Sequence, residues 1–212
     1  MAYKHGVYTS EVPTSVVPAV NTTAGLPVVF GTAPVHLASE RAQSNKPILC
    51  YSYAEAVQQL GYSKDWAKYT LCEVMYSQFA LYNRGPVVFV NVLDPKTHKK
   101  STSSKNVTVT NKVAKVDAPV LLDTLQIKAS TAGSALIDGS DYEAAYDDDG
   151  VLVITLLDDG TATAASNLTL TYDEIDAAAV DADDIIGGIN VSDGSVKGLE
   201  CLNKVFPITG LV

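Results

Sequence analysis

The residues best suited to chemistry are the carboxylates of two acidic turns, Asp147–Gly150 and Asp158–Gly160. Calcium takes several oxygen ligands, so a cation could be held where two such turns converge. An EF-hand loop aligned on Gly150 fails, because its first ligand would be Ala145 and its bidentate acid Leu156. Runs of Asp that end in Gly are also typical of solvated hairpin turns, which is the interpretation that we favour.

Groups that could act in catalysis are scattered along the chain. His5, His36 and His98 lie in stretches expected to be arm or loop, with no candidate Ser or Cys nucleophile beside them. The sequence contains no Gly-x-Ser-x-Gly elbow, Walker loop, HExxH or GxGxxG motif. A hydrolase would need a histidine and a nucleophile that meet only in the folded chain, since triads assemble in three dimensions. We therefore expect that the protein is not an enzyme and needs no cofactor.

The cysteines and the apolar runs indicate an ordinary globular chain. Cys50, Cys72 and Cys201 lack CxxC spacing, which argues against a disulfide framework or a zinc site and suits core residues in a reducing compartment. The longest apolar run, Val151–Leu157, has the length of a strand and is too short to cross a bilayer. No basic region followed by an apolar stretch marks a secretory signal at the N-terminus, so we expect no membrane partner.

The net charge of −9 is unevenly distributed. Between Asp117 and Asp184, sixteen Asp and Glu residues accompany one basic residue, Lys128, for a formal charge of −15; the rest of the chain carries +6. This split predicts an acidic module set into a mildly basic host. Nucleic acid is not an expected partner, because the acidic module repels phosphates and the host has only two arginines, Arg41 and Arg84.

The first part of the chain predicts an α/β body. The apolar run Leu26–Gly31 has the length of a buried strand. Ser52 and Glu55 form a capping box that opens a helix ending at Gly61, and the apolar side of this helix is expected to carry Ala54, Val57 and Leu60.

A second, longer helix is expected from Asp65 to Asn83, followed by a buried strand over Val87–Val92. Strand, helices and strand in this order predict a βαβ crossover with two parallel strands. The helix carries its apolar residues at steps of three and four: Tyr69, Cys72, Met75, Tyr76, Phe79 and Tyr82.

The middle of the chain predicts an all-β module. A loop rich in Lys, Ser and Thr is expected over Asp94–Lys105, after which the apolar pattern alternates in Val107–Thr110, Leu125–Lys128 and Asn167–Tyr172. Short strands separated by Asp-Gly turns are typical of a small sandwich or barrel. The fold class is therefore α+β or α/β: a body with a βαβ crossover and an inserted all-β domain. The predicted divisions are residues 1–22, an extended arm; 23–98, the first part of the body; 99–184, the inserted acidic β domain; and 185–212, a return to the body.

The first twenty residues predict an extended arm. Pro13 and Pro18 prevent a helix, and the apolar residues between them favour extended backbone. Such a segment is suited to adding a strand to another chain, with Tyr3 and Tyr8 as interface anchors. The residues expected to make this contact are Gly6, Val7, Tyr8, Val12, Pro13, Val16, Val17 and Pro18.

The arm, its Asn/Thr/Gly spacer and the strand that closes in Phe30-Gly31-Thr32-Ala33 resemble the start of contractile phage tail sheath proteins. Tyr53–Gly61, the helix that ends in Asn83-Arg84-Gly85, and Gly194–Leu211 resemble later elements of the same family. The chain departs from the family pattern at Arg84, where a glycine is expected. Its last residue, Val212, falls where the family's C-terminal half is expected to begin.

The resemblance implies a structural subunit of a phage or prophage tail, assembled in the host cytoplasm and carried in the virion. Copies of the subunit would polymerise helically around a tail tube protein, joined by strand-exchanging arms. The alternative is a calcium- or carbohydrate-binding β module on a structural scaffold, which predicts thermal stabilisation by calcium.

Overall fold

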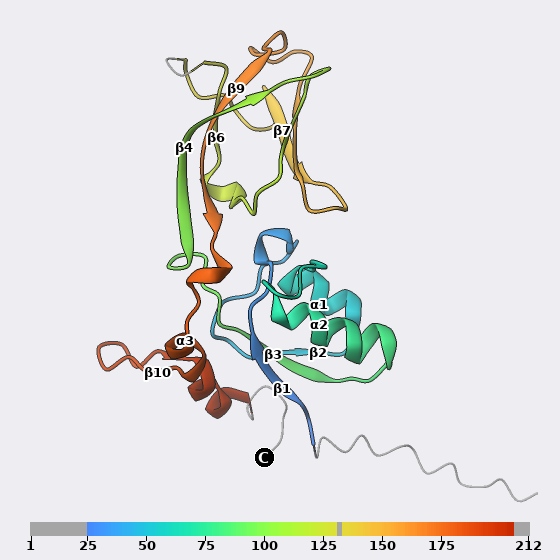
Figure 1. Ribbon diagram of the computed structural model, residues 1–212, viewed down its shortest axis with the longest axis vertical. Coiled ribbons are helices and arrows are strands. Elements are labelled where there is room, and N and C mark those ends of the chain that lie inside the picture. Colours follow the sequence, from blue (N-terminus) through green and yellow to red (C-terminus); the bar gives the residue numbers. More distant parts are fainter. Residues whose placement is uncertain (1–24, 131–132, 206–212) are drawn as a thin grey trace, which may run out of the picture.

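A three-stranded sheet with two helices beside it forms the lower part of the molecule in Figure 1. The computed structural model describes residues 25–130 and 133–205. In this sheet β3 (Val87–Asn91) lies between β1 (Val28–Gly31) and β2 (Ile48–Cys50). β1 runs parallel to β3 and β2 runs antiparallel to it. The predicted mixture of helices and strands is therefore confirmed.

Burial differs between the central strand and its neighbours. Every residue of β3 is buried, as expected for a continuous apolar run between two strands. In β1 only Gly31 is fully buried, because β1 is an edge strand of this sheet. A Cβ at Gly31 would lie 2.4 Å from Thr70 Oγ1, so this glycine lets the following helix approach the sheet.

The first helix, α1 (Tyr53–Leu60), begins and ends where the sequence predicts. Ser52 accepts a hydrogen bond from the Glu55 amide, and the Glu55 carboxylate accepts one from the amide of Tyr51. Gly61 ends the helix with φ 74°. The buried side is Ala56 and Leu60, whereas Ala54 is exposed, so its assignment to the apolar side was wrong. The apolar stripe starts one residue earlier, at Tyr53, and this shift turns Ala54 outward.

The second helix is shorter than predicted at its start. α2 (Thr70–Met75) continues into a π-helical segment, Tyr76–Leu81. Asp65 and the residues after it form a separate turn, in which the Asp65 carboxylate and carbonyl accept from the Lys68 and Tyr69 amides. This local bonding replaces the helical pattern that was expected from Asp65 onward. Leu71, Cys72, Met75 and Phe79 are buried against the sheet and α1.

Two antiparallel sheets form the upper part of the molecule in Figure 1. In one, β9 (Asn167–Ile175) lies between β4 (Lys99–Thr108) and β6 (Gln126–Lys128). In the other, β8 (Leu152–Leu156) lies between β5 (Val113–Val116) and β7 (Tyr142–Tyr146). Both sheets contribute to one apolar core, which makes them a small sandwich. The core includes Ala114, Val116, Ile127, Tyr142, Leu152, Ile154, Leu168, Leu170 and Tyr172.

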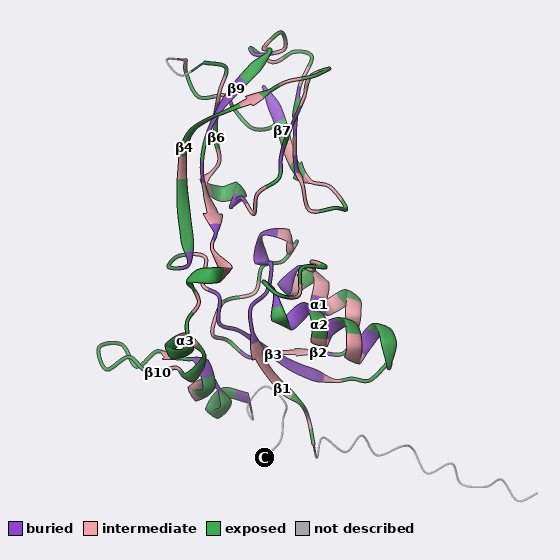
Figure 2. Ribbon diagram, in the orientation of Figure 1, coloured by how far each residue is buried: buried purple, intermediate pink, exposed green. Residues whose placement is uncertain are grey.

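The predicted loop over Asp94–Lys105 is wrong for its second half. β4 starts at Lys99 and pairs with β9 from Lys99↔Ile175 to Thr108↔Asn167, with an irregularity between Thr102 and Lys105. Most of its side chains are exposed, which accounts for the polar sequence (Figure 2). β4 is an edge strand, and lysines are common there because they discourage further strand pairing.

The last described residues form a small unit beside the body, which we call the α3–η5 unit (residues 181–205). It contains α3 (Ala182–Ile186), the short hairpin of β10 (Gly188–Ile189) and β11 (Val196–Lys197), and the 3₁₀ helix η5 (Gly198–Lys204). In Figure 1 this unit lies at the lower left, away from α1 and α2. Its buried residues are Gly198, Cys201 and Val205.

Candidate functional site: a polar junction and an unpartnered unit

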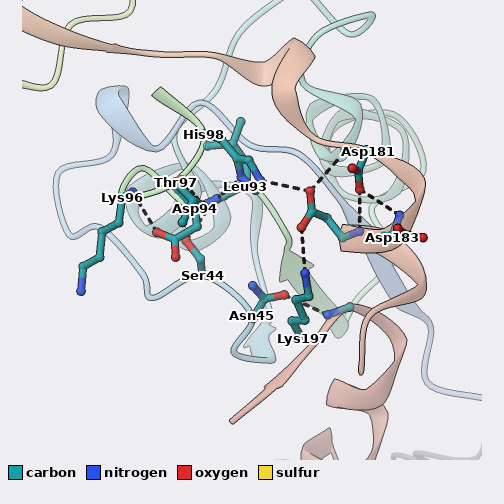
Figure 3. Close-up of polar contacts among 12 residues, drawn as sticks. Ser44, Asn45, Leu93, Asp94, Lys96, Thr97, His98, Asp181, Asp183 and Lys197 are labelled. Atoms are coloured by element: carbon teal, nitrogen blue, oxygen red, sulfur yellow. Dashed lines mark hydrogen bonds and ion pairs between the residues drawn. The ribbon is translucent and has the colours of Figure 1, made fainter. Parts of the chain in front are cut away.

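A polar junction joins the chain that leaves the body to the chain that returns to it (Figure 3). The backbone amide of Asp94 donates to His98 Nδ1 at 2.9 Å, and His98 Nε2 lies 3.0 Å from Asp184 Oδ2. Since Nδ1 accepts from an amide, the proton of the neutral ring is on Nε2 and points at the carboxylate. The His98 and Asp184 side chains are 11% and 16% exposed, so this bond is largely shielded from water.

Asp184 is also the centre of the junction's charges. Its Oδ2 accepts from the amide of Asp181, and its Oδ1 lies 3.2 Å from Lys197 Nζ. Burial raises the pKa of the Asp184 carboxyl, but the bonds from the Asp181 amide and Lys197 and the nearby His98 outweigh burial, and the net pKa lies below its usual value. Asp184 therefore stays ionised and holds α3, β11 and the start of β4 together.

Two asparagines extend the junction into the body. Asn45 Oδ1 accepts from the amide of Gly198, and the Asn45 carbonyl accepts from Cys201 Sγ. The backbone N–H of Asn45 in turn donates to the backbone carbonyl of Asn91 at the end of β3. Asn91 is 1% exposed, and its Oδ1 accepts from the amides of Ala33 and Leu93. These bonds connect the ends of β1 and β3 to the α3–η5 unit.

Close backbone contact within the α3–η5 unit depends on glycine. Gly187 ends α3 with φ 78°, and a Cβ there would lie 1.9 Å from the carbonyl oxygen of Lys197. Gly198 has φ 58°, and a Cβ there would lie 2.4 Å from the carbonyl oxygen of Ile185. No other residue type fits either position without moving the backbone.

An aromatic contact joins the body to the sandwich. The ring of His36 lies edge-on to Tyr146 of β7 at 5.3 Å and 6.0 Å from the ring of Tyr69. Burial, and to a lesser extent the charge of Arg41, lowers the pKa of His36 to about 4. His36 is therefore a neutral core residue here.

The acidic turns use their carboxylates locally. Asp147 Oδ1 accepts from the amides of Asp149 and Val151, and Asp158 pairs with Lys112. In residues 25–130 and 133–205, no three His, Cys, Asp or Glu side chains converge in a way that could hold a metal ion. The calcium alternative thus gains no support from the geometry of these turns.

The predicted arm contacts cannot be placed, because all of them lie outside the described residues. They are Gly6, Val7, Tyr8, Val12, Pro13, Val16, Val17 and Pro18. The same holds for His5 and Tyr3. Their role in subunit contact stays a prediction.

Comparison with known proteins identifies a relative. No family model matches the chain. The chain is 30% identical over 214 aligned residues to the tail sheath protein of Burkholderia phage BcepMu, and the match covers 98% of the chain. The chain is therefore similar, over nearly all of its length, to a phage tail sheath protein. The resemblance read from the arm and its neighbouring strands is thereby confirmed.

The match is unequal in length. The chain spans 41% of the length of the phage BcepMu tail sheath protein. Its nearly complete coverage means that the sandwich and the α3–η5 unit both fall within the aligned region. Among the described residues, no helix is long and apolar enough to cross a membrane.

The polar junction was not predicted from the sequence. His98 and Asp184 were assigned to a loop and to a module boundary, and nothing local connects two residues 86 positions apart. One signal was present: Asp181 and Asp184 have capping-box spacing, and the structure shows both bonds of that box.

Proposed function

We propose that the protein is a structural subunit of a contractile tail sheath. The observation that carries this proposal is the match of almost the whole chain to a tail sheath protein. Supporting it, the described residues are organised for rigidity: two apolar cores and a polar junction that ties three segments together. A subunit that moves as a near-rigid body is what a contracting lattice requires.

In this proposal, copies of the subunit stack helically around a tail tube protein. The arm, residues 1–22, joins neighbouring copies by adding a strand to another subunit. Association through backbone hydrogen bonds keeps neighbours connected while their bodies rotate. The subunit acts in the virion tail after assembly in the host cytoplasm.

The sandwich is proposed to be an inserted domain, residues 99–184, carried between the body and residues 185–212. The His98–Asp184 bond supports this division, because it joins the segment that would enter the inserted domain to the segment that would leave it. We propose no catalytic role and no cofactor. The function is mechanical, and the residues with perturbed pKa are explained by burial or by structural pairing.

Electron microscopy of the purified, natural-length gene product tests the proposal. Regular hollow tubes or stacked discs are the expected result, with or without tail tube protein as a template. Dispersed particles in both conditions, together with a calcium-dependent rise in melting temperature, would overturn it in favour of a binding module.

A further inference from the structure

Two residues of the proposed insert belong to the core of the body. Leu121 and Ile175 both fall within residues 99–184, yet they are packed in the same apolar cluster as residues of α1, α2 and β3. They are only 2% and 4% exposed. Ala177 and Val180, further along the returning chain, pack against the same cluster. The body core is therefore completed by side chains from the sandwich and from the chain that leaves it.

Neighbouring residues of the same segments belong to the other core. Val120 and Tyr172 are buried in the apolar cluster of the sandwich. The chain thus passes from one core to the other between Val120 and Leu121, and again between Tyr172 and Ile175. Successive side chains of an extended segment point to opposite sides, so the same stretch of backbone serves both cores.

Backbone hydrogen bonds hold these two segments side by side. The N–H of Leu121 donates to the carbonyl of Asp173 at 2.8 Å. The N–H of Ile175 donates to the carbonyl of Pro119 at 2.9 Å, and an antiparallel bridge lies between the two bonds. Residues 119–121 therefore lie along the last residues of β9, and this short ladder fixes the positions of both shared side chains.

A second contact joins the other sheet of the sandwich to the body. Tyr146 of β7 donates its O–H to the Val120 carbonyl at 2.7 Å, and its ring lies 5.3 Å from the ring of His36. In the turn after β7, a Cβ at Gly150 would lie 3.6 Å from Leu37 Cδ1. His36 and Leu37 lie between β1 and β2, where the chain of the body rises toward the sandwich (Figure 1). Both sheets of the sandwich therefore contact the body, at two separate places.

We propose that the sandwich is a rigid lever built onto the body, and that the two open and unfold as one cooperative unit. Domains with a small or polar interface move relative to one another, whereas a shared, close-packed apolar core resists such motion. The inference goes beyond the proposed sheath function, because it concerns a single copy of this chain. In the proposed sheath, it means that a rotating body carries its sandwich through the same angle.

Amide hydrogen exchange of the whole chain, measured by NMR, tests this coupling. Exchange reports the free energy of opening segment by segment, so β3 reads the body and β8 reads the sandwich. Ile154→Val removes one carbon from the sandwich core, at a fully buried position of β8. Thr155→Ser is the matched control, since it also removes one carbon from β8 but at an exposed position.

Ile154→Val is expected to speed the exchange of the slowest amides of β3 and of β8 by the same factor, roughly fivefold. The factor is shared because the slowest amides exchange only when the whole cooperative unit opens. Thr155→Ser is expected to leave both strands unchanged. Faster exchange in β8 beside unchanged exchange in β3 would overturn the proposal, since the sandwich would then open by itself.

A second pair of variants tests the shared core directly. Leu121→Ala shortens a side chain that reaches the body core, and exchange in β3 is expected to accelerate at least tenfold. Leu122→Ala is its control, because the neighbouring leucine is 38% exposed. If Leu121→Ala does not fold, Leu121→Val gives the same comparison with a smaller change, roughly fivefold. Unchanged exchange in β3 of the folded variant would contradict the shared core.

These measurements are separate from the test of the sheath function. They are made on dispersed single chains, whereas electron microscopy reads the assembly of many copies. Independent opening of the sandwich would overturn the lever and leave the sheath proposal standing. Coupled opening without tubes would do the reverse.

Discussion

His98 Nε2 lies 3.0 Å from Asp184 Oδ2 and joins two points of the chain that are 86 residues apart. The other ring nitrogen accepts from the Asp94 amide, so both nitrogens of this nearly buried ring are used. A histidine with one acceptor and one donor role in fixed positions orients whatever it joins. Here it orients α3 against the turn that leads into β4.

Asp184→Ala is expected to lower the free energy of unfolding by about 2 kcal/mol. The substitution leaves the His98 N–H without its acceptor and removes the partner of Lys197, and a hydrogen bond to a charged group contributes about 1.5–3 kcal/mol. Urea unfolding monitored by circular dichroism measures the change. Asp183→Ala is the matched control, since Asp183 is an exposed carboxylate in the same helix turn and should change stability by less than about 0.5 kcal/mol. Equal losses of unfolding free energy from the two substitutions would show that the bonds of Asp184 to His98 and Lys197 do not stabilise the fold.

Gly187→Ala is expected to release the β10–β11 hairpin from α3. The new Cβ would fall 1.9 Å from the Lys197 carbonyl oxygen, so the backbone must move, and the combination of φ 78° and ψ −153° adds about 1–3 kcal/mol for a residue with a side chain. Limited proteolysis at residues 188–197 is the measurement, with cleavage expected to accelerate at least tenfold.

Gly139→Ala separates the two causes. Gly139 has nearly the same φ, 75°, but a Cβ there meets nothing within 4 Å. It should show only the backbone cost of about 1–2 kcal/mol and no local opening. If both alanines gave the same proteolysis pattern, close packing at Gly187 would not be the reason for its glycine.

Local signals predicted the elements that they fully determine. α1 was placed correctly because Ser52, Glu55 and Gly61 are all within reach of its own backbone. β3 was placed because its first four residues, Val87 to Val90, form a continuous apolar run, as is typical of a strand covered on both faces. The start of α2 was misplaced because Asp65 bonds to its own turn, which competes with a helix of similar composition.

Elements that depend on distant partners were not predictable in the same way. Lys99 to Lys105 form a strand only because β9, some seventy residues later, supplies the ladder, and their exposed polar side chains look like a loop. The junction is the extreme case, since His98 has no local partner that would reveal Asp184. The capping-box spacing of Asp181 and Asp184 could have located α3, but not its contact.

His36 is expected to make stability fall between pH 6.5 and about 4. Its folded pKa is lowered to about 4, whereas the unfolded chain takes up the proton near 6.5. Over that interval the unfolded state binds one more proton, so unfolding becomes easier as the pH falls, by up to about 3 kcal/mol in total. Below about pH 4 this contribution stops changing.

His36→Phe isolates the effect, because phenylalanine keeps a ring between Tyr69 and Tyr146 but cannot be protonated. Unfolding free energies of both proteins are measured in urea from pH 7 to pH 4.5. The difference between them should shift in favour of the variant as the pH falls. A constant difference over this range would mean that His36 is not held neutral by burial.

Removal of residues 2–20 is expected to abolish polymerisation of the full-length protein without unfolding its body. Among residues 25–130 and 133–205, the two apolar cores are built from side chains of the body and the sandwich, and we expect these cores to keep the body folded without the arm. In the proposed sheath, the arm is expected to supply the extended backbone for strand addition between subunits. Electron microscopy detects the loss of tubes, and an unchanged melting temperature shows that the fold is intact.

Substituting Gly for both Pro13 and Pro18 in the intact arm should weaken assembly without abolishing it, because the arm then loses its bias toward extended backbone. Normal tubes from the truncated protein would remove the arm from the mechanism and would leave body-to-body contacts to carry the lattice.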